Sequence, residues 1–188
     1  LDNRHDLVPM VPMARAAALH NPTHFYCYWN VILQLVAHTS GINNYLLNID
    51  FMSALNEDNF EDCGVLTIGL HRILRRMHSG VRDSIDIGNS KGEGQVSFKD
   101  TVQSCTDTLP DGHQDATEAW LFLISFVHSS VADLKNKSRI SDILCGKLSS
   151  TTTCPLEGCG HSNETLHPCW GLQIPITDNA TSLDNCIE

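Results

Sequence analysis

The chain has 188 residues, of which 41% are hydrophobic and 18% are charged, and this composition predicts a folded domain, alone or with a smaller appendage, and excludes a disordered chain. The 22 Asp and Glu residues outnumber the 12 Lys and Arg residues, and the formal net charge of −10 argues against a nucleic-acid partner. No apolar run approaches the roughly 20 residues of a membrane span, so we expect no membrane partner either. The sequence opens on Leu1 rather than Met, so we expect it to be part of a longer protein.

The cysteines favour a reducing compartment. Eight cysteines in a short secreted chain would indicate a disulfide framework. Here the chain is long, and four of the cysteines crowd between Cys145 and Cys169. We therefore expect free thiols, available for metal binding or catalysis, in a protein of the cytoplasm or the nucleus.

Hydrophobic periodicity predicts a helical first part followed by strands. After a lead-in at residues 1–18, apolar residues recur at helical spacing in four segments, 28–36, 66–77, 98–104 and 114–134. The sequence HTSG at 38–41 is expected to end the first helix, and the glycine-rich stretch 86–95 is expected to form a hinge loop. Beyond residue 141 the pattern predicts strands at 148–153, 162–166 and 171–176. Helices first and strands after is an α+β pattern.

Cys27 stands one residue before the first predicted helix. The partial positive charge and unpaired N–H groups of a helix N-terminus favour a thiolate over a thiol. Papain-like proteases prepare their nucleophile in this way, with a histidine paired to it in space. The alternative is that Cys27 is a small core residue.

Four segments resemble the ubiquitin-specific proteases. CYWNVILQ at 27–34 is similar to that family's cysteine box, C-Y-x-N-x-x-L-Q, and QDATE at 114–118 is similar to its Q-D-A-x-E helix start. ILCGKL at 143–148, followed by Cys154 and Cys159, resembles the entry to the family's fingers, and SLDNC at 182–186 resembles the start of its next helix. The segments occur in the family's order and cover most of the chain from Leu19 onward.

The resemblance implies an α+β, papain-like fold with a helical thumb at 19–147 and the start of the β fingers and palm at 148–188. It implies a deubiquitinating cysteine hydrolase that cleaves the isopeptide or peptide bond after the C-terminal glycine of ubiquitin, with Cys27 as the nucleophile. Ubiquitin and ubiquitinated proteins would be its partners, and no cofactor is required for catalysis. Gln114, Asp115 and Glu118 would line the channel for the basic ubiquitin tail. Asp115 and Glu118 are equally well explained as a helix cap and a first-turn dipole partner.

The chain departs from the family pattern next to the nucleophile. The oxyanion-stabilising Asn of the family falls five residues before the Cys, where this chain has Pro22, and Asn21 lies one residue further away. We take Asn21 as the candidate donor to the oxyanion. The family's general base is a His in a late box that no histidine of this chain matches, so activity depends on a base from elsewhere. The alternative is a catalytically inactive family member that binds ubiquitin or another protein.

The resemblance also implies a structural zinc site at Cys154 and Cys159. The family's fingers hold tetrahedral Zn²⁺ with two C-x-x-C pairs, whereas this pair has four intervening residues. His161 or Cys169 could complete a local site. The alternatives are two reduced cysteines without a metal, or a small zinc-binding scaffold that spans Cys145–Cys169.

Overall fold

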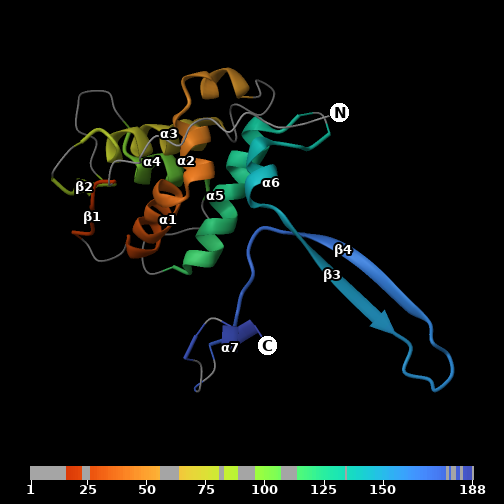
Figure 1. Cartoon of the computed structure of the whole chain (residues 1–188). Coiled ribbons are helices and arrows are strands. Elements are labelled where there is room, and N and C mark those ends of the chain that lie inside the picture. The colour runs from red at the N-terminus through yellow and green to blue at the C-terminus, as the bar shows by residue number, and fades with distance from the viewer. Residues whose placement is uncertain are drawn as a thin grey trace. The chain divides into compact units, whose positions relative to one another are not determined.

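The computed structural model describes residues 16–22, 26–55, 64–80, 83–88, 96–106, 114–133, 135–176, 178, 181–182 and 184–187. The chain divides into two compact units, Leu1–Ile143 and Leu144–Glu188, which we describe separately (Figure 1). Most of the predicted lead-in, residues 1–15, and most of the predicted hinge loop, residues 89–95, lie outside the described residues.

The first unit is a group of helices with one small sheet. The helices are α1 (Cys27–His38), α2 (Ser40–Leu47), the 3₁₀ helix η1 (Ile49–Ala54), α3 (Val65–Met77), α4 (Phe98–Cys105), α5 (Ala116–Val131) and α6 (Arg139–Leu144). The sheet pairs β1 (Leu19–His20) with β2 (Ile85–Asp86) in parallel, with Leu19 opposite Ile85. Helix α1 packs against α2, α3 and α5, so it lies at the centre of the unit (Figure 1).

The core of this unit is built on the apolar face of α1. Leu33 and Val36 are fully buried, as are Leu123 and Val127 on α5. Trp29 of α1 meets Phe98 of α4 edge to face, with the ring centroids 5.4 Å apart. Aromatic pairs in this geometry add to the stabilisation that comes from burial alone. The helix that carries Cys27 is therefore anchored in the core by its apolar face.

Helix α3 approaches its neighbours closely at two small or polar residues. A Cβ atom on Gly69 would lie 2.8 Å from Cγ2 of Thr101 on α4, so the glycine permits this contact. Helices α3 and α5 are joined by a buried hydrogen bond, 2.8 Å long, between the hydroxyl groups of Thr67 and Ser130. The glycine that weakens the helical pattern of 66–77 thus has a packing reason.

All four predicted helices are confirmed, but α2, η1, α6 and the β1–β2 pair were not predicted. Helix α2 was missed because HTSG looks like a stop. Thr39 does end α1, through its N–H group and the carbonyl oxygens of Leu35 and Val36, and its own carbonyl then accepts the N–H group of Asn43 in α2. Thr39, in an extended conformation, is therefore both the C-cap residue of α1 and the N-cap residue of α2. Within the described residues no helix has the length and apolar character to span a membrane.

The second unit contains a long β-hairpin. Strands β3 (Gly146–Thr153) and β4 (Ser162–Cys169) pair antiparallel, from Gly146 opposite Cys169 to Thr153 opposite Ser162. The predicted strands at 148–153 and 162–166 are confirmed and are longer than expected. The short helix α7 (Asp184–Ile187) overlaps the segment 182–186, which resembles a family helix start.

The strand predicted at 171–176 is wrong, because these residues form no strand. A strand needs a neighbour for its backbone hydrogen bonds, and within the described residues β3 pairs only with β4. Pro175 also lacks an N–H donor.

Candidate active site

Cys27 is the first residue of α1, and its thiol is exposed. The sequence placed it one residue before the helix; the structure shows Tyr26 as the N-cap residue, with its carbonyl oxygen accepting the N–H group of Asn30 at 2.9 Å. The N–H groups of a first helical turn have no acceptor inside the helix. Cys27 therefore combines an accessible sulfur with the backbone donors of a helix N-terminus.

Two polar residues of the cysteine box attach α1 to the segment before it. The side-chain amide of Asn30 donates to the carbonyl oxygen of His20 at 3.3 Å, and that of Gln34 donates to the carbonyl oxygen of Ala17 at 2.9 Å. Residues 27, 30 and 34 have helical spacing, so both amides lie on the face of α1 that carries the thiol. The polar positions of this motif thus hold residues 17–20 along α1.

Asn21 contacts the approach to Cys27 through its side-chain carbonyl. Its Oδ1 accepts the backbone N–H group of Tyr26 at 3.0 Å. This bond connects residue 21 directly to the N-cap residue of α1. The predicted role of Asn21 as an oxyanion donor remains a prediction, because the observed bond uses the acceptor of the amide and not its N–H₂ donors.

Tyr26 and His24 are the bulky residues that stand before Cys27 where the family pattern has Thr and Gly; His24 lies outside the described residues, and Tyr26 makes contacts that the sequence did not predict. Only 9% of its surface is exposed. Nζ of Lys99, on α4, lies 5.3 Å from the centroid of the Tyr26 ring, and a Cβ atom on Gly88 would lie 3.7 Å from Cε2 of the ring. No local pattern in the sequence could have predicted these contacts, since Gly88 and Lys99 are distant from Tyr26 along the chain.

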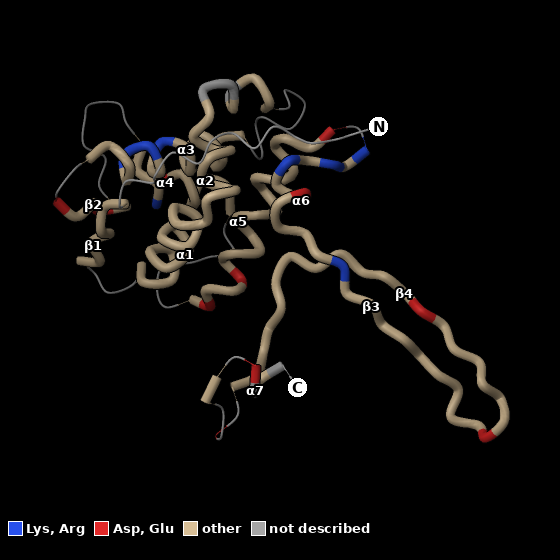
Figure 2. The backbone as a smooth tube through the Cα atoms, viewed as in Figure 1, with Lys and Arg blue, Asp and Glu red and all other residues tan. Residues whose placement is uncertain are grey.

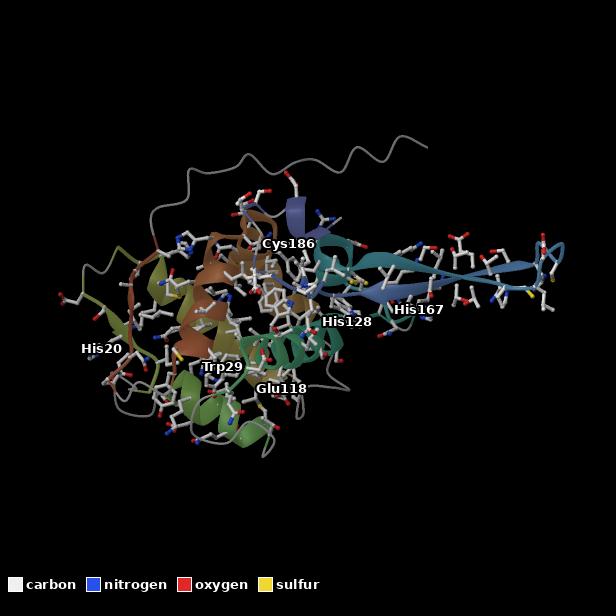
Figure 3. The ribbon with its side chains drawn as sticks, turned by 90° about the horizontal axis from the view of Figure 1, so that it is seen from below. His20, Trp29, Glu118, His128, His167 and Cys186 are labelled. Carbon is white, nitrogen blue, oxygen red and sulfur yellow. The ribbon has the colours of Figure 1, made fainter. Side chains whose placement is uncertain are left out.

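Three of the described histidines hydrogen-bond groups other than the nucleophile. Nδ1 of His38 bonds the carbonyl oxygen of Gln34, Nδ1 of His71 bonds that of Leu46, and His128 bonds Ser138 and Asn136. Figure 3 shows His20 and His128 at opposite sides of the first unit. Of the described residues, none is a histidine hydrogen-bonded to Cys27; His24 and His113 lie outside them.

The residues predicted to line the ubiquitin-tail channel surround the start of α5. Asp115 is the N-cap residue, and its Oδ1 accepts the N–H group of Thr117 at 2.7 Å. Glu118 is exposed in the first turn (Figure 3), and Figure 2 shows this acidic end of the helix. Gln114 precedes the cap and is half-buried. The capping role of Asp115 is confirmed, and contact of these three residues with ubiquitin stays a prediction.

Cys154 and Cys159 meet in the loop that joins β3 to β4. The N–H group of Cys154 donates to the carbonyl oxygen of His161 at 2.9 Å, which closes the loop. The backbone N–H group of His161, and then the side chain of Cys154, hydrogen-bond the Cys159 sulfur and lower its pKa from the ordinary thiol value. A thiolate stabilised in this way is suited to binding Zn²⁺.

The hairpin brings two candidate zinc ligands together, Cys154 and Cys159, and not four. The described part of the chain holds no group of three or more metal-ligating side chains. Cys169 pairs with Gly146 at the opposite end of β4 from the loop, so it cannot complete the site, and the same separation argues against a compact scaffold spanning Cys145–Cys169. The pair therefore fits half of a tetrahedral zinc site.

Comparisons with known proteins agree with the motifs. The family model described as ubiquitin carboxyl-terminal hydrolase matches residues 19–169. Two curated proteins of Arabidopsis thaliana, ubiquitin carboxyl-terminal hydrolase 9 and ubiquitin carboxyl-terminal hydrolase 10, are each 25% identical over 186 residues, covering 82% of this chain and 19% of theirs. The chain thus spans about a fifth of the length of these curated relatives.

Solved structures share the fold. A chain in the structure of the SAGA Ubp8/Sgf11/Sus1/Sgf73 DUB module bound to ubiquitin aldehyde matches with a TM-score of 0.67 and 19% identity, over 94% of this chain and 39% of that one. The structure of the Ubp8-Sgf11-Sgf73-Sus1 SAGA DUB module matches with a TM-score of 0.58 and 20% identity, over 92% of this chain and 38% of that one. The predicted α+β fold of the ubiquitin-specific protease type is confirmed.

Proposed function

Since the chain belongs to the ubiquitin carboxyl-terminal hydrolase family, we propose that its parent protein is a cysteine deubiquitinase with Cys27 as the nucleophile. The observation that carries this proposal is the exposed thiol at the first residue of a helix that is otherwise anchored in the core. The substrates would be ubiquitinated proteins, cleaved after the terminal glycine of ubiquitin. The seven described cysteines are all free, which supports a protein of the cytoplasm or the nucleus.

The chemistry assigned to this chain is nucleophilic attack and stabilisation of the oxyanion. The Cys27 thiolate would add to the carbonyl carbon of the terminal glycine, and the N–H groups at the start of α1 would donate to the oxyanion that forms. Collapse of this intermediate would expel the lysine amine, and water would then hydrolyse the thioester. A histidine would take the thiol proton and return it to the amine. We propose that this base comes from outside the residues described here.

A second candidate function is binding of ubiquitin or another protein without cleavage. It is favoured by the observation that, in the described part of the chain, no histidine is bonded to Cys27. The same residues at the start of α5, Asp115 and Glu118, would then serve recognition alone.

Labelling with ubiquitin that carries a C-terminal electrophile separates these two functions. The full-length protein should form a covalent adduct, and Cys27→Ala should abolish it, whereas Cys105→Ala should not. Binding of ubiquitin without any adduct would support the non-catalytic function and refute the proposed one.

We also propose that Cys154 and Cys159 are half of a structural zinc site, completed by ligands outside the described residues. The lowered pKa of Cys159 and the closed loop support this assignment. The ion would stabilise the fingers and would not take part in the reaction. Zinc analysis of the full-length protein should find one bound ion, lost in Cys154→Ser; a metal-free protein with a folded hairpin would refute it.

A further inference from the structure

The residue directly before the nucleophile is held from two directions. Its backbone N–H group donates to Oδ1 of Asn21, and its ring packs beside Lys99 and Gly88. Tyr26 is therefore restrained at its main chain by Asn21 and at its side chain by Gly88, in the turn after β2, and by Lys99 on α4. A lysine within about 6 Å of an aromatic face is attracted to the ring, and the attraction grows as the pair is desolvated.

The environment of this ring is itself ordered. The N–H group of Gly88 donates to Oδ1 of Asp86 at 2.9 Å, and the N–H group of Lys99 donates to the carbonyl oxygen of Ile87 at 3.1 Å. Both bonds fix the backbone on which the Tyr26 ring rests. The charged groups that the printed contacts place beside this ring are Lys99, on α4, and Asp86, whose Oδ1 lies next to Gly88; His20 is opposite Asp86 in the β1–β2 pair.

Helix α1 needs such an external restraint at its start. Its N-cap residue makes no side-chain capping bond, and its first turn carries no acidic residue. A helix without these features frays at its N-terminus, since the first N–H groups lack acceptors. The position of Cys27 relative to the backbone donors of α1 then depends on where Tyr26 is held.

We infer that Tyr26 is a positioning residue for Cys27 and that Asn21 acts as the acceptor that fixes its backbone. The inference rests on the proposed function in one respect, that Cys27 is the nucleophile. The aromatic side chain and the asparagine, in this view, replace a side-chain cap. This role does not require either residue to contact the reacting atoms.

Alkylation of Cys27 by iodoacetamide measures this positioning without ubiquitin. In this reaction the thiolate sulfur forms a bond to the methylene carbon and iodide leaves, so no oxyanion develops. The full-length protein and its variants are alkylated at one pH, and peptide mass spectrometry reports the rate profile of Cys27, its modified fraction against time, separately from those of the other cysteines. The backbone donors of a helix N-terminus act on the sulfur only where the first turn is held in place, so weakening that terminus should slow the alkylation.

We expect Tyr26→Ala to slow the alkylation of Cys27 roughly 1.7- to 5-fold, the size of a helix-terminus effect. Tyr26→Phe keeps the ring and should keep the profile of the unchanged protein. Lys99→Ala should give a smaller change in the alkylation of Cys27, and Lys99→Arg, which keeps the positive charge, should give none. Equal profiles for Tyr26→Ala and Tyr26→Phe, with equal helical content by circular dichroism, would overturn the inference.

Asn21→Ala keeps the test decisive if Tyr26→Ala does not fold, because Asn21 lies outside the core. A shifted alkylation profile supports its role as an acceptor. Slower hydrolysis of a ubiquitin substrate with an unchanged alkylation profile would instead identify an oxyanion donor and overturn that role. Failure of the ubiquitin probe to label the unchanged protein would refute the proposed function alone, since alkylation does not depend on it.

Discussion

Gly69→Ala tests the contact between α3 and α4, and the sign of its effect follows from two opposing terms. Alanine in a helix interior is favoured over glycine by about 1 kcal/mol. The new Cβ atom, however, would lie 2.8 Å from Cγ2 and 3.3 Å from Cβ of Thr101. Such overpacking costs about 1–3 kcal/mol. We therefore expect a loss in the free energy of unfolding of about 0–2 kcal/mol.

Thr101 cannot easily move aside to relieve this contact. It is 5% exposed, and its hydroxyl group donates to the carbonyl oxygen of Ser97 at 2.9 Å. Thr101→Ser removes the clashing methyl group and keeps this bond. In that background the nearest remaining atom is Cβ of residue 101, at 3.3 Å, so Gly69→Ala should be less destabilising than with Thr101 intact, and stabilising by at most about 1 kcal/mol.

Urea denaturation of the four proteins in this cycle, followed by circular dichroism, measures both effects and their coupling. The reasoning is refuted if Gly69→Ala stabilises the protein with Thr101 intact by as much as it does with Ser at that position. Equal effects would mean that the methyl group does not restrict α3.

Two further predictions concern the candidate binding residues. Glu118→Gln should raise KM for a ubiquitin substrate about 1.4- to 5-fold, the range of an exposed ion pair. It should lower Tm by at most about 4 °C, through the loss of a first-turn dipole partner, and an unchanged KM would leave Glu118 only this role at the helix start. In the metal-free protein, iodoacetamide at neutral pH should modify Cys159 faster than an ordinary exposed thiol, since the lowered pKa of Cys159 keeps it a thiolate at lower pH. Cys154→Ala should slow this modification only in part, because the N–H group of His161 still donates to the sulfur, and no change in rate would contradict the hydrogen bond from Cys154.

The helices that periodicity predicts are those whose buried face is continuous. Leu66, Leu70 and Leu74 are all essentially buried in α3, at the spacing that the sequence shows. Helix α2 has no such stripe of its own to mark it, and its start depends on the backbone of Thr39. The parallel pair β1–β2 is too short for any alternation, and it joins residues that are distant in sequence. Local patterns cannot indicate a pairing of this kind.

The features of the candidate site can also be separated into those that nearby residues determine and those that depend on residues distant in sequence. The place of Cys27, the cap at Asp115 and the meeting of Cys154 with Cys159 all follow from residues within a few positions of one another. The packing of Lys99 on Tyr26 does not, because it requires α4 to lie beside the start of α1.

Beside Cys27 the chain departs from the family pattern on only one side. Downstream of Cys27 the chain follows the pattern, and there Asn30 and Gln34 hold residues 17–20 against α1 through side-chain amides. Upstream it departs, and there the backbone is held by Asn21 and the ring of Tyr26 instead. A bulky residue beside the nucleophile is thus compatible with an ordered start to α1. The altered sequence before Cys27 therefore does not by itself indicate an inactive protein, and the question of activity depends on the base.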